Sequence, residues 1–225
     1  MEKERVKGSY KRMSELVDKK PDLIEEIVGE KISWICPKDG KERQLNSKDI
    51  LKRLGLDENL FEEFWPKRSP QWDGMFIAKD TATLYLIEAK SHLTEISSGN
   101  RLSKECSEDH KKNYLMKCKT LRSTMSYFNV MVDDNIWLHK YYQISNRIAF
   151  HLKVKEKLPT DIINNVKLIF LNFVNDPDWK EEKKQASEND WEKKYNKILK
   201  EMGLTYEQFF ENDIFIWNID ADKLI

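Results

Sequence analysis

The stretch QWDGMFIAKDTATLYLIEAKSH, residues 71–92, carries three charged side chains among apolar residues that predict a β-hairpin. Glu88 and Lys90 close the second strand, and alternation along a strand places both side chains on one face. Asp73 opens the first strand, so antiparallel pairing brings it level with them. Two carboxylates and an ammonium group therefore converge.

Stability alone is a poor reason to place these charges there, because a buried ion pair seldom does better than an apolar replacement. Binding of Mg²⁺ would explain the charges better, since this ion takes as ligands one or two carboxylates, retained waters and a phosphate oxygen. Lys90 could then polarise an attacking water or balance the charge of the transition state. The alternative is a surface ion pair at a strand end, because Glu-x-Lys recurs in the polar helical sequence of residues 181–194.

The flanking sequence predicts the elements that hold these residues. Residues 57–68 predict an amphipathic helix with Leu60, Phe61, Phe64 and Trp65 on one stripe, and residues 91–134 predict an insertion with one long helix. From Ile136, apolar residues recur at helical spacing, namely Trp137, Tyr141, Ile144, Ile148 and Leu152. Val166–Val174 is almost continuously apolar, as in an interior parallel strand.

The two ends of the chain predict extensions of this core. The first thirty residues indicate two short helices, and Asp39-Gly40 indicates a hairpin over residues 32–45. The tail predicts helices that flank the sheet and ends in the strand-like sequence DIFIWNI. With 225 residues, we expect a single domain over 1–225.

The order of Asp73, a second apolar strand, Glu88-Ala89-Lys90, a helix and a buried strand resembles the PD-(D/E)xK phosphodiesterase superfamily, which has the restriction-endonuclease-like fold. The resemblance covers residues 57–174, about half the chain. It implies an α/β fold with a mixed central β-sheet flanked by helices, an N-terminal helical and hairpin extension and a C-terminal helical extension. Trp72 stands where the family often has proline, and residues 91–134 lengthen the link to the next helix.

The resemblance also implies the chemistry. Asp73, Glu88 and the backbone carbonyl of Ala89 would hold Mg²⁺ or Mn²⁺, and Lys90 would be the catalytic base. We expect a DNA endonuclease of restriction or defence type, although RNA, and cutting within or at the end of a strand, stay open. Cutting both strands would favour a homodimer.

Supporting residues come from the neighbouring helices. Members of the RecB type place a glutamine on the helix after the site; Gln143 resembles it, and Arg147 stands where their tyrosine would be. Lys140, Gln143, Arg147 and His151 form either a ridge for phosphates or a solvated helix face. Some members use a glutamate from the first helix, and either Glu62 or Glu63 could take that role.

Local positive charge could hold nucleic acid through phosphates, or could only aid solubility. It lies at Lys67 and Arg68, and in the insertion at Lys111, Lys112, Lys117, Lys119 and Arg122. The whole chain is neutral, with 39 basic and 39 acidic residues, so a global basic signature is lacking. No apolar run is long enough for a membrane span, and we expect a soluble, cytoplasmic protein.

Two alternatives to the enzyme remain. The chain could keep this fold as an inactive nucleic-acid-binding or assembly module, which has no need of a metal. It could also be an unrelated α/β domain in which Asp73 and Glu88 diverge.

Overall fold

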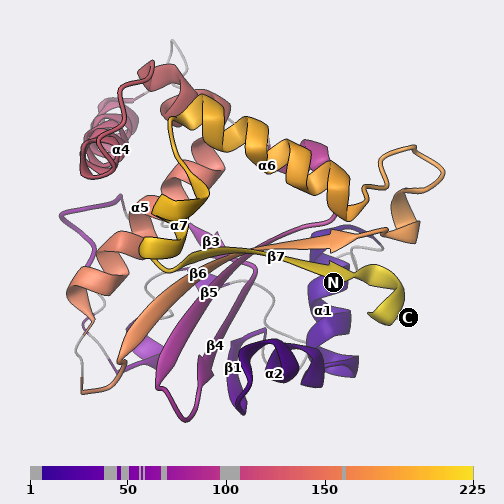
Figure 1. Cartoon of the computed structure of the whole chain (residues 1–225). Coiled ribbons are helices and arrows are strands. Elements are labelled where there is room, and N and C mark those ends of the chain that lie inside the picture. The colour runs from indigo at the N-terminus through magenta and orange to yellow at the C-terminus, as the bar shows by residue number, and fades with distance from the viewer. Residues whose placement is uncertain are drawn as a thin grey trace.

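A five-stranded mixed sheet forms the centre of the molecule (Figure 1). The computed structural model describes residues 7–37, 45–46, 51–55, 57, 59–66, 70–96, 107–158 and 161–224. In spatial order, the strands are β1 (Ile32–Cys36), β4 (Gly74–Ala78), β5 (Thr83–Lys90), β6 (Asn165–Val174) and β7 (Ile214–Asp220). β1, β4 and β5 pair antiparallel, whereas β5, β6 and β7 run parallel. The predicted α/β class with a mixed central sheet is confirmed.

Helices cover both faces of the sheet (Figure 1). One face carries α1 (Ser9–Lys19) and α2 (Asp22–Val28), which are the two predicted N-terminal helices. The other face carries α5 (Tyr142–Lys157), α6 (Glu188–Met202) and α7 (Tyr206–Glu211), and α4 (Glu108–Tyr127) packs outside α5. The short elements are β2 (Leu45–Asn46), β3 (Gln71–Trp72), η1 (Leu93–Ile96), η2 (Ile136–Lys140), η3 (Pro177–Trp179) and η4 (Ala221–Leu224). None of the described helices combines the length and apolar character needed to cross a bilayer.

β5 separates two apolar cores because its side chains alternate between the faces of the sheet. Leu84 and Leu86 join the core beneath α5, whereas Tyr85, Ile87 and Ala89 join the core beneath α1. Every residue of the strand is buried. Any charged side chain at its end is therefore removed from bulk water and must find partners inside the protein.

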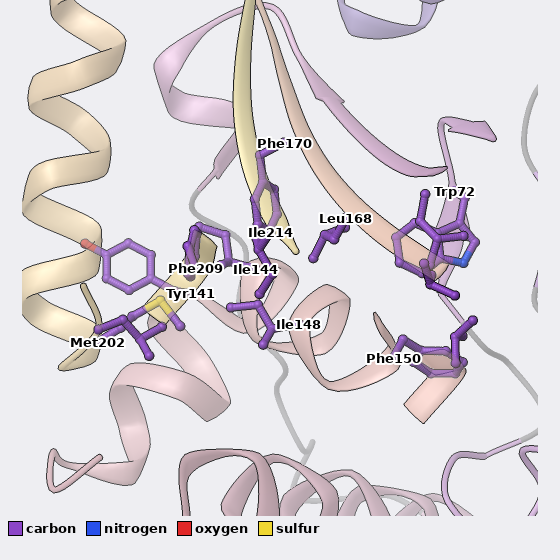
Figure 2. Packing of buried hydrophobic residues seen from close by; sticks show 14 of the residues in the cluster. Trp72, Tyr141, Ile144, Ile148, Phe150, Leu168, Phe170, Met202, Phe209 and Ile214 are labelled. Carbon is purple, nitrogen blue, oxygen red and sulfur yellow. The ribbon is translucent and has the colours of Figure 1, made fainter. Parts of the chain in front are cut away.

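The helix predicted from Ile136 is present and begins with the π-turn η2, in which Tyr141 N donates to Ile136 O at 2.9 Å. Its stripe is buried against the sheet, with Leu152 partly buried. Figure 2 shows Ile144 and Ile148 of this helix packed near Leu168 and Phe170 of β6. This packing holds one face of α5 against β6.

The predicted N-terminal hairpin is wrong in its pairing. β1 pairs with β4, and the short β2 pairs with β3; Asp39 and Gly40 lie outside the described residues. An isolated two-stranded ribbon is marginal in water. At the sheet edge, Trp34 instead packs on Phe76 with ring centroids 5.1 Å apart.

Two further expectations need correction. The described residues of the predicted helix over 57–68 form successive turns, in which Phe61 and Trp65 are still buried. The apolar stripe therefore directs packing without a regular helix. The C-terminal part also does more than flank the sheet, because β7 adds a parallel edge strand beside β6.

Candidate functional site

Asp73 lies in the bend between β3 and β4, beside the end of β5, where Glu88 is located. Met75 of β4 pairs with Leu86 of β5, and both side chains lie in the core beneath α5. Glu88 is two residues after Leu86 and has this face by alternation. Asp73 precedes β4 in a bend, and the charges of Glu88, Lys90 and Arg147 all act on it. Asp73 N donates to Ile87 O at 3.1 Å, which continues the pairing to this level.

Both carboxylate oxygens of Glu88 contact cations. Lys90 Nζ contacts Oε1, and the Arg147 guanidinium contacts Oε2 through Nε and Nη2, each at 2.6 Å. The three residues are buried, with exposed fractions of 2% for Glu88, 8% for Lys90 and 6% for Arg147. Charge-assisted hydrogen bonds of this length are among the strongest in proteins. Glu88 is therefore fixed between two cations.

Arg147 reaches Glu88 from α5 and is held by several other groups. Nη1 donates to Asn146 Oδ1 and Nη2 donates to Gln71 O, both at 2.7 Å. The guanidinium carbon lies 5.0 Å from the ring centroid of Trp72, within the range of a cation–π contact. The planar guanidinium thus joins α5 to the backbone just before Asp73.

Asp73 has an unusual electrostatic environment. Its Oδ2 accepts a hydrogen bond from Ala89 N at 2.9 Å. Burial, followed by the negative charge of Glu88, raises the pKa of Asp73 to about 6, and the charges of Lys90 and Arg147 only partly offset this. Repulsion between two neighbouring carboxylates is what a bound divalent cation relieves.

Glu88 and Lys90 stabilise each other's charged forms. Burial alone would raise the pKa of Glu88, but the charges of Arg147 and Lys90 outweigh it and lower that pKa. Burial alone would lower the pKa of Lys90, but Glu88 and Asp73 raise it above the usual range. Lys90 is therefore an ammonium group here, which suits charge stabilisation better than proton abstraction.

A polar row extends from this cluster across the parallel strands. Lys90 of β5 is level with Asn172 of β6, which is level with Asn218 of β7. Asn172 is fully buried; its Nδ2 donates to Asn218 Oδ1 at 3.0 Å, and its Oδ1 accepts from Tyr195 OH at 3.2 Å. Sequence reasoning missed this row, although Asn172 is a polar residue inside the apolar run of β6.

The other residues predicted for the site lie in different environments. Gln143 is half-buried on α5, one turn before Arg147, while Glu62 and Glu63 are exposed on the turns ahead of Trp65. Of the four residues of the predicted α5 ridge, only Lys140 is exposed, and it pairs with Glu201 at 2.6 Å. His151 is buried with Nε2 2.7 Å from Asn212 O. The ridge is therefore not a continuous phosphate-facing surface.

Two of the predicted basic residues lie on α4. Lys111 and Lys112 are exposed near the start of α4, and Lys111 pairs with Glu108 at 2.5 Å. Lys67 and Arg68 lie outside the described residues. The charge of Lys111 is thus shared with a neighbour, whereas Lys112 presents its side chain to solvent.

The donor set fits a hard divalent cation at Asp73 and Glu88. Among the described residues, no group of three or more His, Cys, Asp or Glu side chains is placed to hold a metal. Mg²⁺ needs only one or two carboxylates because it keeps several waters. Burial, followed by the charge of Glu88, raises the pKa of Asp73, and a divalent cation would favour the ionised carboxylate there.

Comparisons of the chain with protein-family models, with curated proteins and with solved structures find no match. The case for a function therefore depends on the buried cluster of Asp73, Glu88, Lys90 and Arg147.

Proposed function

We propose that the chain is a metal-dependent phosphodiesterase of the PD-(D/E)xK type, with DNA as substrate and an endonuclease role in restriction or defence. The observation that carries this proposal is the convergence of Asp73 and Glu88 at the end of β5, with Lys90 beside them. The order of strands and helix around the cluster supports the restriction-endonuclease-like fold as the finer description. A packed α/β domain gains little stability from two buried acids whose charges repel, which favours a chemical role.

Asp73 and Glu88, with the backbone carbonyl of Ala89, would hold Mg²⁺ or Mn²⁺. When bound, such a cation polarises a phosphoryl oxygen and lowers the pKa of a coordinated water. The ammonium group of Lys90 would donate hydrogen bonds to the phosphate as negative charge develops on it. The buried polar row from Lys90 to Asn172 flanks the cluster on the side of β6.

Cleavage assays test the proposal. Supercoiled plasmid, linear duplex, single-stranded DNA and RNA are each incubated with Mg²⁺ or Mn²⁺ and with wild type, Asp73→Asn or Lys90→Met. Either substitution should reduce cleavage by about 100-fold or more, whereas the control Lys193→Met, at an exposed position on α6, should lose little.

Cutting that survives both site variants would remove the catalytic assignment. The preferred substrate decides between DNA and RNA and between internal and terminal cutting. Sedimentation of the active species tests the proposed homodimer.

A second candidate function is an inactive nucleic-acid-binding or assembly module with the same fold. The favouring observation is that Glu88 is already paired through both oxygens, with Lys90 and Arg147, so two acids and two bases form a neutral cluster. A purely structural cluster would need no metal. Calorimetry with Mn²⁺ separates the candidates, because only the enzyme should take up the ion in an Asp73-dependent way.

A further inference from the structure

The Arg147 guanidinium donates two hydrogen bonds to one of the two carboxylate oxygens of Glu88. Nε and Nη2 both donate to Oε2, while Lys90 contacts Oε1. A carboxylate oxygen has about two lone-pair sites, so two donors use the capacity of Oε2. Any further ligand at this oxygen must compete with Arg147.

Arg147 is also firmly held in this position. Beyond Glu88, its donors reach Asn146 Oδ1 and Gln71 O, and its plane lies near the Trp72 ring. Asn146 belongs to α5, and Gln71 and Trp72 belong to β3. Moving the Arg147 side chain would leave these acceptors and Glu88 without their donor.

Two cations cannot share one carboxylate oxygen without repulsion. We propose that Arg147 competes with the divalent cation for Glu88 and thereby weakens metal binding at this site. This inference rests on the proposed function, because it needs a metal held by Asp73 and Glu88. It assigns Arg147 a role in setting the affinity of the site for the metal, rather than that of a surface contact for nucleic acid.

Titration calorimetry with Mn²⁺ alone, at pH 8 and without nucleic acid, tests the inference. The proteins are wild type, Arg147→Met, Arg147→Met with Asp73→Asn, and the control Arg122→Met. Arg122 pairs with Asp134 at 2.6 Å on the exposed side of α4, so the control removes an arginine elsewhere. Arg147→Met should bind Mn²⁺ about tenfold more tightly than wild type, the Asp73→Asn background should abolish binding, and the control should match wild type.

Two results overturn the inference in different ways. Equal or weaker Mn²⁺ binding by Arg147→Met, with Asp73-dependent binding in wild type, shows that Arg147 does not compete, and leaves the proposed function standing. No Asp73-dependent binding in either protein removes the metal site and the proposed function with it.

A second variant covers the case in which Arg147→Met fails to fold, as judged by near-ultraviolet circular dichroism. Arg147→Lys keeps one positive charge but cannot contact Glu88, Gln71 and Asn146 together with a planar group. Its Mn²⁺ affinity should rise above that of wild type by a smaller factor. An unchanged affinity in this variant contradicts the competition.

Discussion

Asp73 lies in the bend just before β4, beside the end of β5, where Glu88 contacts a cation through each carboxylate oxygen. Asp73 accepts from the amide of Ala89 and has its pKa raised by burial and by the charge of Glu88. The two acids therefore affect the metal-free protein in opposite ways. Their substitutions should change stability with opposite sign.

Asp73→Asn should stabilise the metal-free protein at high pH. Because the folded pKa of Asp73 is raised from 3.8 to about 6, the favourable contribution of its protonated form is complete below pH 3.8 and is lost as pH rises through 6. Asparagine stays neutral and can still accept from Ala89 N. At pH 8 in the presence of a chelator, urea unfolding should show that the free energy of unfolding of Asp73→Asn exceeds that of wild type by up to about 3 kcal/mol.

The gain from Asp73→Asn should shrink towards zero near pH 4, where wild-type Asp73 is itself protonated. Asp80→Asn, on the exposed turn between β4 and β5, is the matched control and should show no such pH-dependent gain. A gain of equal size at pH 4 and pH 8 would contradict the role of charge.

Glu88→Gln should strongly destabilise the fold. The substitution leaves the buried ammonium of Lys90 and the guanidinium of Arg147 without their shared carboxylate. Removing one partner of a buried ionic cluster costs about 3–5 kcal/mol. Chemical unfolding at pH 7.5 measures this loss, and the exposed Glu63→Gln should change stability by less than about 0.5 kcal/mol.

The double variant Glu88→Gln with Arg147→Met should recover part of the loss, because one uncompensated cation is then removed. A double variant less stable than Glu88→Gln alone would show that the contacts of Arg147 with Gln71 and Asn146 matter more than the cost of its unpaired charge.

Local periodicity predicted the strands, the long helices and the shared face of Glu88 and Lys90, because alternation along a strand depends only on the local sequence. The pairing of β1 with β4 could not be obtained in this way. An apolar run such as ISWIC is compatible either with a local hairpin or with pairing in the central sheet. Which pairing forms depends on the helices that cover the strand. Here these helices are α1 and α2.

The partner of Glu88 was also beyond local patterns. Arg147 was predicted on the polar side of its helix, but 59 residues separate it from Glu88, and only the packing of α5 on β6 brings the two together. Asn172 carried a detectable signal, since it is a polar residue in an apolar strand just as Glu88 is. A search for polar residues near the ends of buried parallel strands would have found it.

The Arg12–Asp176 pair should be essential to the fold but not to metal binding. Arg12 of α1 donates to Asp176 Oδ1 through Nε at 3.0 Å and through Nη2 at 2.6 Å, and both residues are fully or almost fully buried. Arg12→Met or Asp176→Asn should each cost about 3–5 kcal/mol, because a buried charge is left behind.

The double variant should lose less than the sum of the two, with a coupling of about 1–3 kcal/mol in a double-mutant cycle. The Mn²⁺ affinity of any folded variant should equal that of wild type, since neither residue contacts Glu88 in the part of the chain that the structure describes. Additive losses would show that the two residues contribute independently.

His151 should make the protein less stable as the pH falls. A carbonyl oxygen can only accept, so Nε2, at 2.7 Å from Asn212 O, carries the proton of the neutral ring. Nδ1 is buried, and among the described residues it has no hydrogen-bond partner. Burial lowers the pKa of His151 to about 4; the positive charge of Lys155 adds to this, and the bond to Asn212 and the charge of Asp213 oppose it.

Because the folded pKa of His151 lies below that of the unfolded chain, near 6.5, the stabilising contribution is complete above pH 6.5 and is lost as the pH falls towards 4. Over this window, the free energy of unfolding of wild type should fall by up to about 3 kcal/mol more than that of His151→Gln. The glutamine amide can still donate to Asn212 O but does not titrate. Urea unfolding at pH 7.5 and 4.5 measures the difference, with the exposed His110→Gln as control. Equal losses of stability in wild type and His151→Gln would assign the acid sensitivity to the buried carboxylates. A loss of stability confined to wild type and the His110→Gln control would assign it to the His151 imidazole, on the side of α5 that faces Asn212.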